Sequence, residues 1–233
     1  MRLERVRSAL PWKRLLAEFT VIVAGVLIAL AVDSWWEERQ ERHHAREYVQ
    51  QLLADVEVTE RRLRSTMETE QQRLEGVSTV IDRALRGPWP HADSLDLPTG
   101  YNYFEPLKGT LTALIQGGDL RLLRSDSIRF ELIAFSALLH ETETVLRHTE
   151  TLIWNSTDRI LNGRARHSQA AARRESNGGR GWGQIDVAGV LNDPEIVSAL
   201  QLQAMASQIR LFNLGRLEEP TSRLIDLLRA ELN

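Results

Sequence analysis

Residues 19–32, FTVIVAGVLIALAV, form the longest apolar run of this chain and contain no charged side chain. A helix that crosses a bilayer needs about 20 predominantly apolar residues. Extension back to Leu15 gives an eighteen-residue segment in which Glu18 is the single charged residue. The sequence therefore predicts a transmembrane helix over residues 15–36.

Tryptophans flank this segment on both sides. Trp12 precedes it, and Trp35 and Trp36 follow it. Twenty-three helical steps of ~1.5 Å separate Trp12 from Trp35 by roughly 34 Å. This length matches two interfacial aromatic belts across a hydrocarbon core of about 30 Å. We therefore expect five residues to lie at the membrane interface: Trp12, Lys13, Arg14, Trp35 and Trp36.

The basic residues predict the orientation. Five arginines and lysines precede the apolar segment against one acid, Glu4, whereas acids and bases are mixed after it. The positive-inside rule predicts a cytoplasmic leader over residues 1–14 and an extracytoplasmic domain over residues 37–233. The alternative is a cleaved signal peptide, because Ala29-Leu30-Ala31 fits a cleavage pattern. Unbroken continuation into helix-forming sequence favours retention, and both interpretations export the remainder.

The charge and the cysteine count limit what the exported part does. After the first 33 residues the chain carries a net charge of about −5, which is mildly acidic. A nucleic-acid-binding domain normally carries a basic surface, so we expect no nucleic-acid partner. The chain contains no cysteine, and no disulfide supports the exported domain.

A long helix is predicted to follow the apolar segment, because residues 26–75 contain no proline and are rich in Glu, Arg, Gln, Leu and Ala. One face carries apolar residues at steps of three and four. This face packs on later helices of the same chain, or alternatively forms a homotypic coiled coil that Thr59 and Glu70 weaken. The predicted stripe consists of Tyr48, Leu52, Val56, Thr59, Leu63, Met67, Glu70, Leu74, Val77 and Ile81.

The remaining segments also read as helices. Pro88 ends the first helix, and a short helix over residues 107–116 ends at Gly117-Gly118. A third helix begins at Ser125 or Asp126 and reaches about Leu161. Asp193-Pro194 opens another helix, and a last helical piece follows Pro220. No strand is predicted, so the fold class is all-α, with loops at about 87–106 and 163–192.

Three blocks of the sequence resemble a known family. They are EFTVIVAGVLIALAVDSWWEER, AREYVQQLLADVE and GTLTALIQGGDLRLLRSDSIRFELIAF, between about residues 17 and 140. The pattern is similar to that of bacterial single-span membrane proteins with an exported helical domain and no assigned function. The resemblance implies a bacterial inner membrane, a periplasmic C-terminal domain and no particular activity.

No catalytic, cofactor-binding or metal-binding motif is present. His43 and Glu47 are i,i+4 neighbours, but a solvated pair is the simpler interpretation. His140, Glu143 and His148 lack the second Glu-x-x-His of a di-iron bundle. No Gly-x-Ser-x-Gly elbow, no cysteine nucleophile and no phosphate-binding loop are found. We therefore expect no enzyme, no cofactor and no metal.

Two segments are candidates for partner contact. The first is the connector rich in aromatic residues, and the second is an Arg- and Gly-rich segment that suits acidic lipid headgroups or an acidic protein face. Packing in the protein's own core and a solvated loop are the respective alternatives. The candidate contact residues are Trp89, Tyr101, Tyr103, Phe104, Arg164, Arg166, Arg173, Arg174, Arg180 and Trp182.

Small residues in the apolar segment allow close approach of another transmembrane helix, and we expect that contact at Ala24, Gly25 and Ala29. The sequence thus favours a non-catalytic accessory or scaffold subunit of a larger inner-membrane complex. The expected partners are membrane lipids and the transmembrane helices of an energy-transducing host, photosynthetic or respiratory, and a homo-oligomer is an alternative. The alternative function is an extracytoplasmic ligand sensor that acts through a partner protein.

Overall fold

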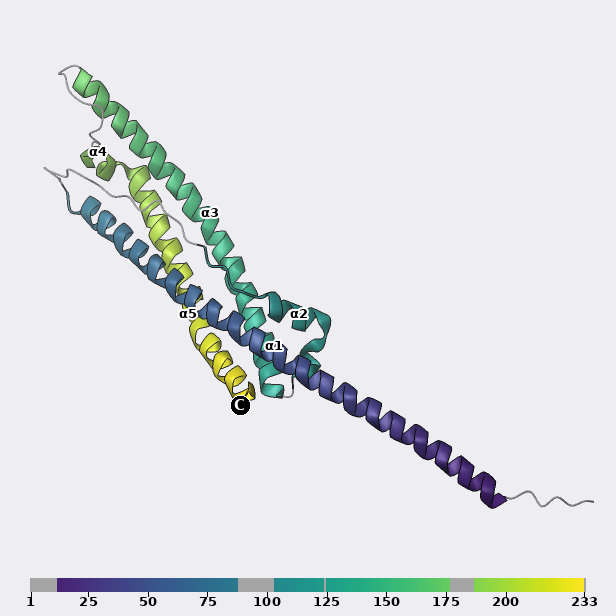
Figure 1. The fold of residues 1–233 in the computed structure, drawn as a ribbon. Helices are drawn as coiled ribbons and strands as arrows, with labels where there is room; N and C mark the ends of the chain where they lie inside the picture. Colours follow the sequence, from purple (N-terminus) through teal and green to yellow (C-terminus); the bar gives the residue numbers. More distant parts are fainter. Residues whose placement is uncertain (1–11, 88–102, 124, 177–186, 233) are drawn as a thin grey trace, which may run out of the picture. The chain divides into compact units, whose positions relative to one another are not determined.

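The computed structural model describes residues 12–87, 103–123, 125–176 and 187–232. These residues are all-helical, as the sequence predicts, and no strand occurs among them. Figure 1 shows the elements as a ribbon. In chain order they are α1 (Trp12–Leu85), α2 (Gly109–Gly117), the 3-10 helix η1 (Asp119–Leu122), α3 (Asp126–Ser176), α4 (Val187–Asn192) and α5 (Pro194–Leu232).

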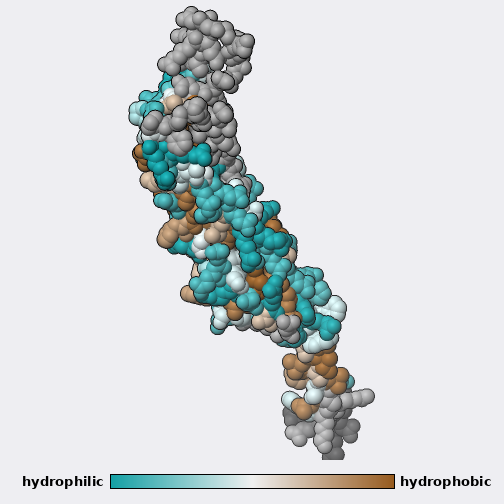
Figure 2. Space-filling model, turned by 90° about the vertical axis from the view of Figure 1, so that its left-hand side faces the viewer, coloured by the Kyte–Doolittle hydropathy of each residue, from teal (hydrophilic) through white to brown (hydrophobic). Residues whose placement is uncertain are grey.

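The chain divides into two compact units, and α1 contributes to both. The first unit is Met1–Tyr48 and the second is Val49–Asn233. In the first unit, the apolar segment of α1 is long and apolar enough to cross a membrane, and none of it is buried. Its described residues are largely brown at the N-terminal end of α1 in Figure 2. The exposed side chains there include Phe19, Ile22, Val26, Leu27 and Leu30.

The second unit is a bundle of three long helices: the part of α1 after Tyr48, α3 and α5 (Figure 1). Val77 of α1, Ile160 of α3 and Ile196 of α5 share one core cluster with α4. At the other end, Glu57 of α1 pairs with Arg229 of α5. Because α1 and α3 reach the shared cluster late in their length and α5 reaches it at its start, α5 runs antiparallel to the other two.

All three helices bury residues at alternating steps of three and four, the pattern of coiled-coil packing. Thr66 and Arg73 are buried in α1, whereas the predicted Met67 and Leu74 are half-buried. The seam of α1 is Val49, Leu52, Val56, Thr59, Leu63, Thr66, Glu70, Arg73, Val77 and Val80. The seam of α3 includes Ile128, Leu132, Phe135, Leu139, Thr142, Leu146, Thr149, Ile153, Ser156 and Ile160. The seam of α5 is Ile196, Leu200, Gln203, Ser207, Arg210, Leu214, Leu217, Thr221, Leu224 and Leu228.

Several helix ends follow the predicted signals. Gly87, just after α1, has φ 88°, and Gly118, just after α2, has φ 74°, a left-handed conformation that suits glycine. The backbone N–H of Ile128 donates to Ser125 Oγ at 3.3 Å, so Ser125 is the N-cap of α3. The N–H of Glu195 donates to Asp193 Oδ1 at 2.9 Å. Asp193 therefore caps α5, with Pro194 in the first helical position.

Two predicted boundaries are wrong. The expected loop over residues 163–192 does not begin at Gly163, because α3 continues to Ser176, and α4 forms over Val187–Asn192. The helix also does not restart at Pro220, which lies inside α5. Buried Leu217 and Leu224 on both sides of Pro220 hold this helix in the bundle. Tertiary packing here outweighs the cost of an interior proline.

Candidate interaction surfaces

The predicted membrane-interface residues lie on α1 in the first unit. Trp12, Trp35 and Trp36 are exposed, with 74%, 53% and 62% of their surface accessible. The guanidinium of Arg39 lies 5.8 Å from the ring centroid of Trp35, within the range of a cation–π interaction. The side chains of Lys13 and Arg14 lie outside the described residues. A position at the bilayer surface stays a prediction for all five residues.

The small-residue face of the apolar segment is open. A Cβ added at Gly25 meets no atom within 4 Å, and Ala24 and Ala29 are exposed. The surface around Gly25 therefore has room for a second helix backbone. Contact with another transmembrane helix remains a prediction.

The aromatic connector is only partly available for a partner. Phe104 is 9% exposed and belongs to the buried core, which favours the alternative of own-core packing for this residue. Its contact with a partner stays a prediction. Tyr103 is 53% exposed. Trp89 and Tyr101 lie outside the described residues.

The predicted arginine surface is not a loop where the structure describes it. Arg164 and Arg166 lie on α3. Arg166 Nη2 donates to Glu195 Oε2 at 2.7 Å and lies 3.6 Å from Asp193 Oδ2. The hydrogen bond that Arg166 donates to Glu195 is the main cause that raises the pKa of Arg166. Arg166 is thus committed to its own chain. The side chains of Arg173 and Arg174, and the whole of Arg180 and Trp182, lie outside the described residues.

Asp193 is the centre of this junction between α3 and α5. His167 Nε2 lies 3.0 Å from Asp193 Oδ2, while Oδ1 accepts the N–H of Glu195. Desolvation by burial raises the pKa of Asp193, but hydrogen bonds from His167, Glu195 and Ile196 together outweigh it, so the pKa lies below its ordinary value. The carboxylate is therefore held in its charged form, which caps the helix and attracts its two basic neighbours.

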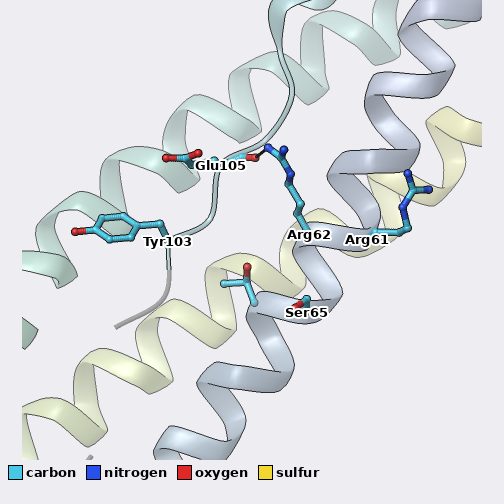
Figure 3. Close-up of a pocket in the computed structure, with 6 residues that line it drawn as sticks. Arg61, Arg62, Ser65, Tyr103 and Glu105 are labelled. Carbon is cyan, nitrogen blue, oxygen red and sulfur yellow. Dashed lines mark hydrogen bonds between the residues drawn. The ribbon is translucent and has the colours of Figure 1, made fainter. Parts of the chain in front are cut away.

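A surface recess of about 480 Å³ lies between α1 and the connector before α2. Figure 3 shows Arg61, Arg62 and Ser65 on α1, with Tyr103 and Glu105 on the connector. Arg62 Nη1 donates to the backbone oxygen of Glu105 at 2.6 Å. Tyr103 and Arg61 lie toward opposite ends of the recess (Figure 3).

Hydrogen bonds hold the connector and the first turn of α2 against the bundle beside this recess. The N–H of Leu107 donates to Thr59 Oγ1 at 3.0 Å, and Thr110 Oγ1 donates to Asp55 Oδ2 at 2.6 Å. Lys108 pairs with Glu143 of α3 at 2.6 Å. The sequence did not reveal the recess, because adjacent arginines on a polar helix face look like ordinary solvated charges. The polar side chain of Thr59 on an otherwise apolar stripe was the one sequence feature that indicated a polar contact with α1 at this point.

The candidate metal ligands are dispersed. His43 Nδ1 lies 3.3 Å from Glu47 Oε1, and both side chains are largely exposed. His148 Nδ1 lies 2.9 Å from the backbone oxygen of Thr144, and Glu143 is bound to Lys108. Within the described parts of the chain, no group of three or more His, Cys, Asp or Glu side chains is placed to hold a metal ion.

Large apolar side chains also lie on the outside of the bundle, which sequence reasoning missed. Phe130 of α3 is 73% exposed and Phe212 of α5 is 69% exposed, with Ile133, Trp154 and Met205 also exposed. Their exposure could have been predicted from the sequence, since these residues fall between the seam positions of their helices. Exposed aromatic residues of this size are typical of contact surfaces.

No family model, no curated protein and no solved structure matches this chain.

Proposed function

We propose that this protein is a non-catalytic, membrane-anchored scaffold, an accessory subunit that stabilises a larger bacterial inner-membrane complex. The observation that carries the proposal is the uncovered apolar segment of α1, none of which is buried. A segment of that length and composition has no stable place in water. Because it is continuous with the first helix of the bundle, it attaches the bundle to the bilayer.

The outer surface of the bundle supports a role in contact. Phe130 and Phe212 expose about seven-tenths of their surface, and each lies on a helix whose opposite face already fills the core. Burying such a side chain at an interface contributes roughly 1.5–3 kcal/mol. The expected host remains an energy-transducing complex, photosynthetic or respiratory, whose transmembrane helices meet Gly25 and its neighbours.

Purification of the full chain in mild detergent tests this proposal. We expect a stoichiometric complex whose mass exceeds that of the chain alone. Phe212→Ser and Phe130→Ser should lower the recovered host, whereas Gln208→Ser, an exposed polar position on α5, should leave recovery unchanged. A chain that runs alone, without partner or bound small molecule, contradicts the proposal.

The proposed topology places the N-terminus in the cytoplasm and the bundle in the periplasm. The chain has no cysteine, so single cysteines report the side of the membrane directly. Gln208→Cys should react with a membrane-impermeant maleimide in intact spheroplasts, and Ser8→Cys should react only after lysis. Labelling of Ser8→Cys in intact spheroplasts would reverse the topology, and the intact mass distinguishes a retained helix from a cleaved signal peptide.

The recess favours a second candidate function, an extracytoplasmic sensor that acts through a partner protein. Arg61 and Arg62 with Ser65 present cationic and hydroxyl donors beside a volume of about 480 Å³, a set that suits a small anion such as a carboxylate or a phosphate. Calorimetry of the full chain with succinate and with inorganic phosphate tests this candidate. Arg61→Gln and Arg62→Gln should abolish binding, while Arg64→Gln should not, since Arg64 is paired with Glu60 at 2.7 Å. The sensor candidate fails if neither probe binds.

A further inference from the structure

The middle of the bundle contains charged groups that are completely removed from solvent. Glu70 of α1 and Ser207 and Arg210 of α5 each expose 0% of their surface. Ser207 Oγ donates to Glu70 Oε1 at 2.7 Å, and Arg210 Nε donates to Glu70 Oε2 at 3.1 Å. Arg73, one turn after Glu70, lies 3.6 Å from the same carboxylate and is also buried. We call these four residues the charged layer.

The charged layer is a poor source of stability. Desolvation of a buried ion pair offsets most of its attraction, and apolar residues of similar volume are often at least as stable. Its directional hydrogen bonds, by contrast, form in only one alignment of the helices. The charged layer is therefore better explained by the alignment that it selects than by the stability that it adds.

The seam makes a choice of alignment necessary. All three helices repeat their buried positions every seven residues, so a slip of α5 by one heptad, about 10.5 Å, again places seam against seam. In the two slipped alignments, Glu70 faces Leu214 and Leu217 or Leu200 and Gln203 instead of Ser207 and Arg210. In either slipped alignment Glu70 loses Arg210 and Ser207 and keeps only Arg73, 3.6 Å away on its own helix, while Arg210 is buried away from Glu70, which is an unfavourable arrangement.

Other contacts also oppose this slip, but they join α5 to α3 rather than to α1: Gln203 Nε2 donates to Thr157 Oγ1 at 2.9 Å, and Ile196 packs closely on Gly163. No cysteine crosslinks the helices. The cross-helix pairs Glu57–Arg229 and Glu141–Arg216 lie on the surface, where ion pairs discriminate weakly.

We propose that the charged layer of Glu70, Arg73, Ser207 and Arg210 is a register lock that fixes α5 against α1 and excludes slipped alignments. The same layer disfavours a second copy of this chain on the seam of α1. In a symmetric parallel pair, Glu70 would face Glu70 and Arg73 would face Arg73, so like charges would be buried together. The register lock thus also keeps the seam of α1 for the protein's own helices.

Distance measurement between two spin labels tests the register lock in the full chain in detergent. Glu68→Cys on α1 and Gln208→Cys on α5 are exposed positions near the charged layer, and the absence of native cysteine makes labelling specific. The parent chain with these labels should give one narrow distance distribution. The apolar variant E70L/R73L/S207A/R210L should stay helical with an equal or higher Tm. Its distances should spread into populations separated by roughly 10 Å, the length of one heptad, or its mass should double.

The matched control removes a surface pair instead. Glu141→Gln with Arg216→Gln carries the same labels and should keep the single narrow distribution. The proposal is overturned if the apolar variant keeps one unchanged distance and the parent mass. Loss of helical structure in the apolar variant also overturns it, because the layer would then provide stability rather than alignment. Glu70→Gln keeps the side-chain shape and one acceptor oxygen, and it should broaden the distribution of spin-label distances. An unchanged distribution with a lower Tm would indicate a purely stabilising role and would overturn the proposal.

Discussion

Gly163 of α3 is predicted to be a position that does not tolerate a methyl group. This glycine is buried in the interior of the helix, opposite the first turn of α5. A Cβ at this position would lie 2.6 Å from Ile196 Cγ1 and 2.7 Å from Ile196 Cδ1. Carbon atoms in proteins pack at about 3.5–4.0 Å, so Gly163→Ala forces an overlap of roughly 1 Å. Ile196 is 1% exposed, and its β-branched side chain has few alternative rotamers.

Two opposing effects determine how much Gly163→Ala changes the free energy of unfolding. Alanine is favoured over glycine in a helix by about 1 kcal/mol, whereas overpacking of a filled core costs about 1–3 kcal/mol. Gly163→Ala should therefore change the free energy of unfolding by between zero and a loss of about 2 kcal/mol. Gly215 of α5 provides the matched control, because its nearest contact for an added Cβ is Met67 Cε at 3.9 Å. Gly215→Ala should gain the full ~1 kcal/mol.

Thermal and urea unfolding of the full chain in detergent, followed by circular dichroism, checks this prediction. Gly163→Ala should unfold about 3–9 °C below Gly215→Ala, from a difference of about 1–3 kcal/mol in a chain of this size. Ile196→Ala lowers stability by itself, but Gly163→Ala should gain about 1 kcal/mol in that background, which gives a coupling of about 1–3 kcal/mol. Equal stability of the two glycine variants, or additive effects of Gly163→Ala and Ile196→Ala, refutes the close approach of α3 and α5.

Three further predictions concern helix ends, surface charge and the interior proline. Asp193 has a pKa below its ordinary value, so its ionic stabilisation is present above its unfolded pKa and is lost as the pH falls through the folded pKa. Unfolding of Asp193→Asn should therefore differ most from the parent near pH 7, with a difference that shrinks below about pH 4, and a pH-independent difference would contradict this. Glu141→Gln should leave Tm unchanged although Arg216 lowers the pKa of Glu141, because the pair is exposed and screened by salt; a clear drop in Tm would contradict it. Pro220→Ala should raise the free energy of unfolding by about 1–3 kcal/mol, since alanine is favoured over proline inside a helix and restores a backbone donor. A lower Tm would show that the proline is needed for packing.

Local signals predicted the starts of α3 and α5 and the end of α2 correctly, because each signal is a short-range interaction between adjacent residues. Ser125 and Asp193 carry side-chain oxygens that satisfy the first backbone N–H groups of α3 and α5. Gly118 takes the left-handed conformation that ends α2. None of these arrangements depends on the rest of the fold.

The same local reasoning gave wrong boundaries at Gly163 and Pro220, because long-range packing decides these positions. A glycine usually weakens a helix, but Gly163 allows Ile196 to approach α3 closely. A proline usually ends a helix, but α5 keeps its seam residues buried on both sides of Pro220. The sequence does not state which residue of α5 lies opposite Gly163, so this reason for the glycine becomes visible only in the assembled bundle.

The charged layer was missed for a different reason. The stripe predicted from apolar residues at steps of three and four correctly includes Glu70. It also includes Met67 and Leu74, whereas the observed seam contains Thr66 and Arg73 at these points. The strict heptad phase is set by the buried valines and leucines at both ends of the α1 seam, and it places Thr66 and Arg73 in the core whatever their polarity. The same phase in α5 selects Arg210. A polar residue at a seam position should therefore be interpreted as a buried group that needs a partner. The partner of Glu70 is Arg210, and this pairing fixes the alignment of α1 and α5.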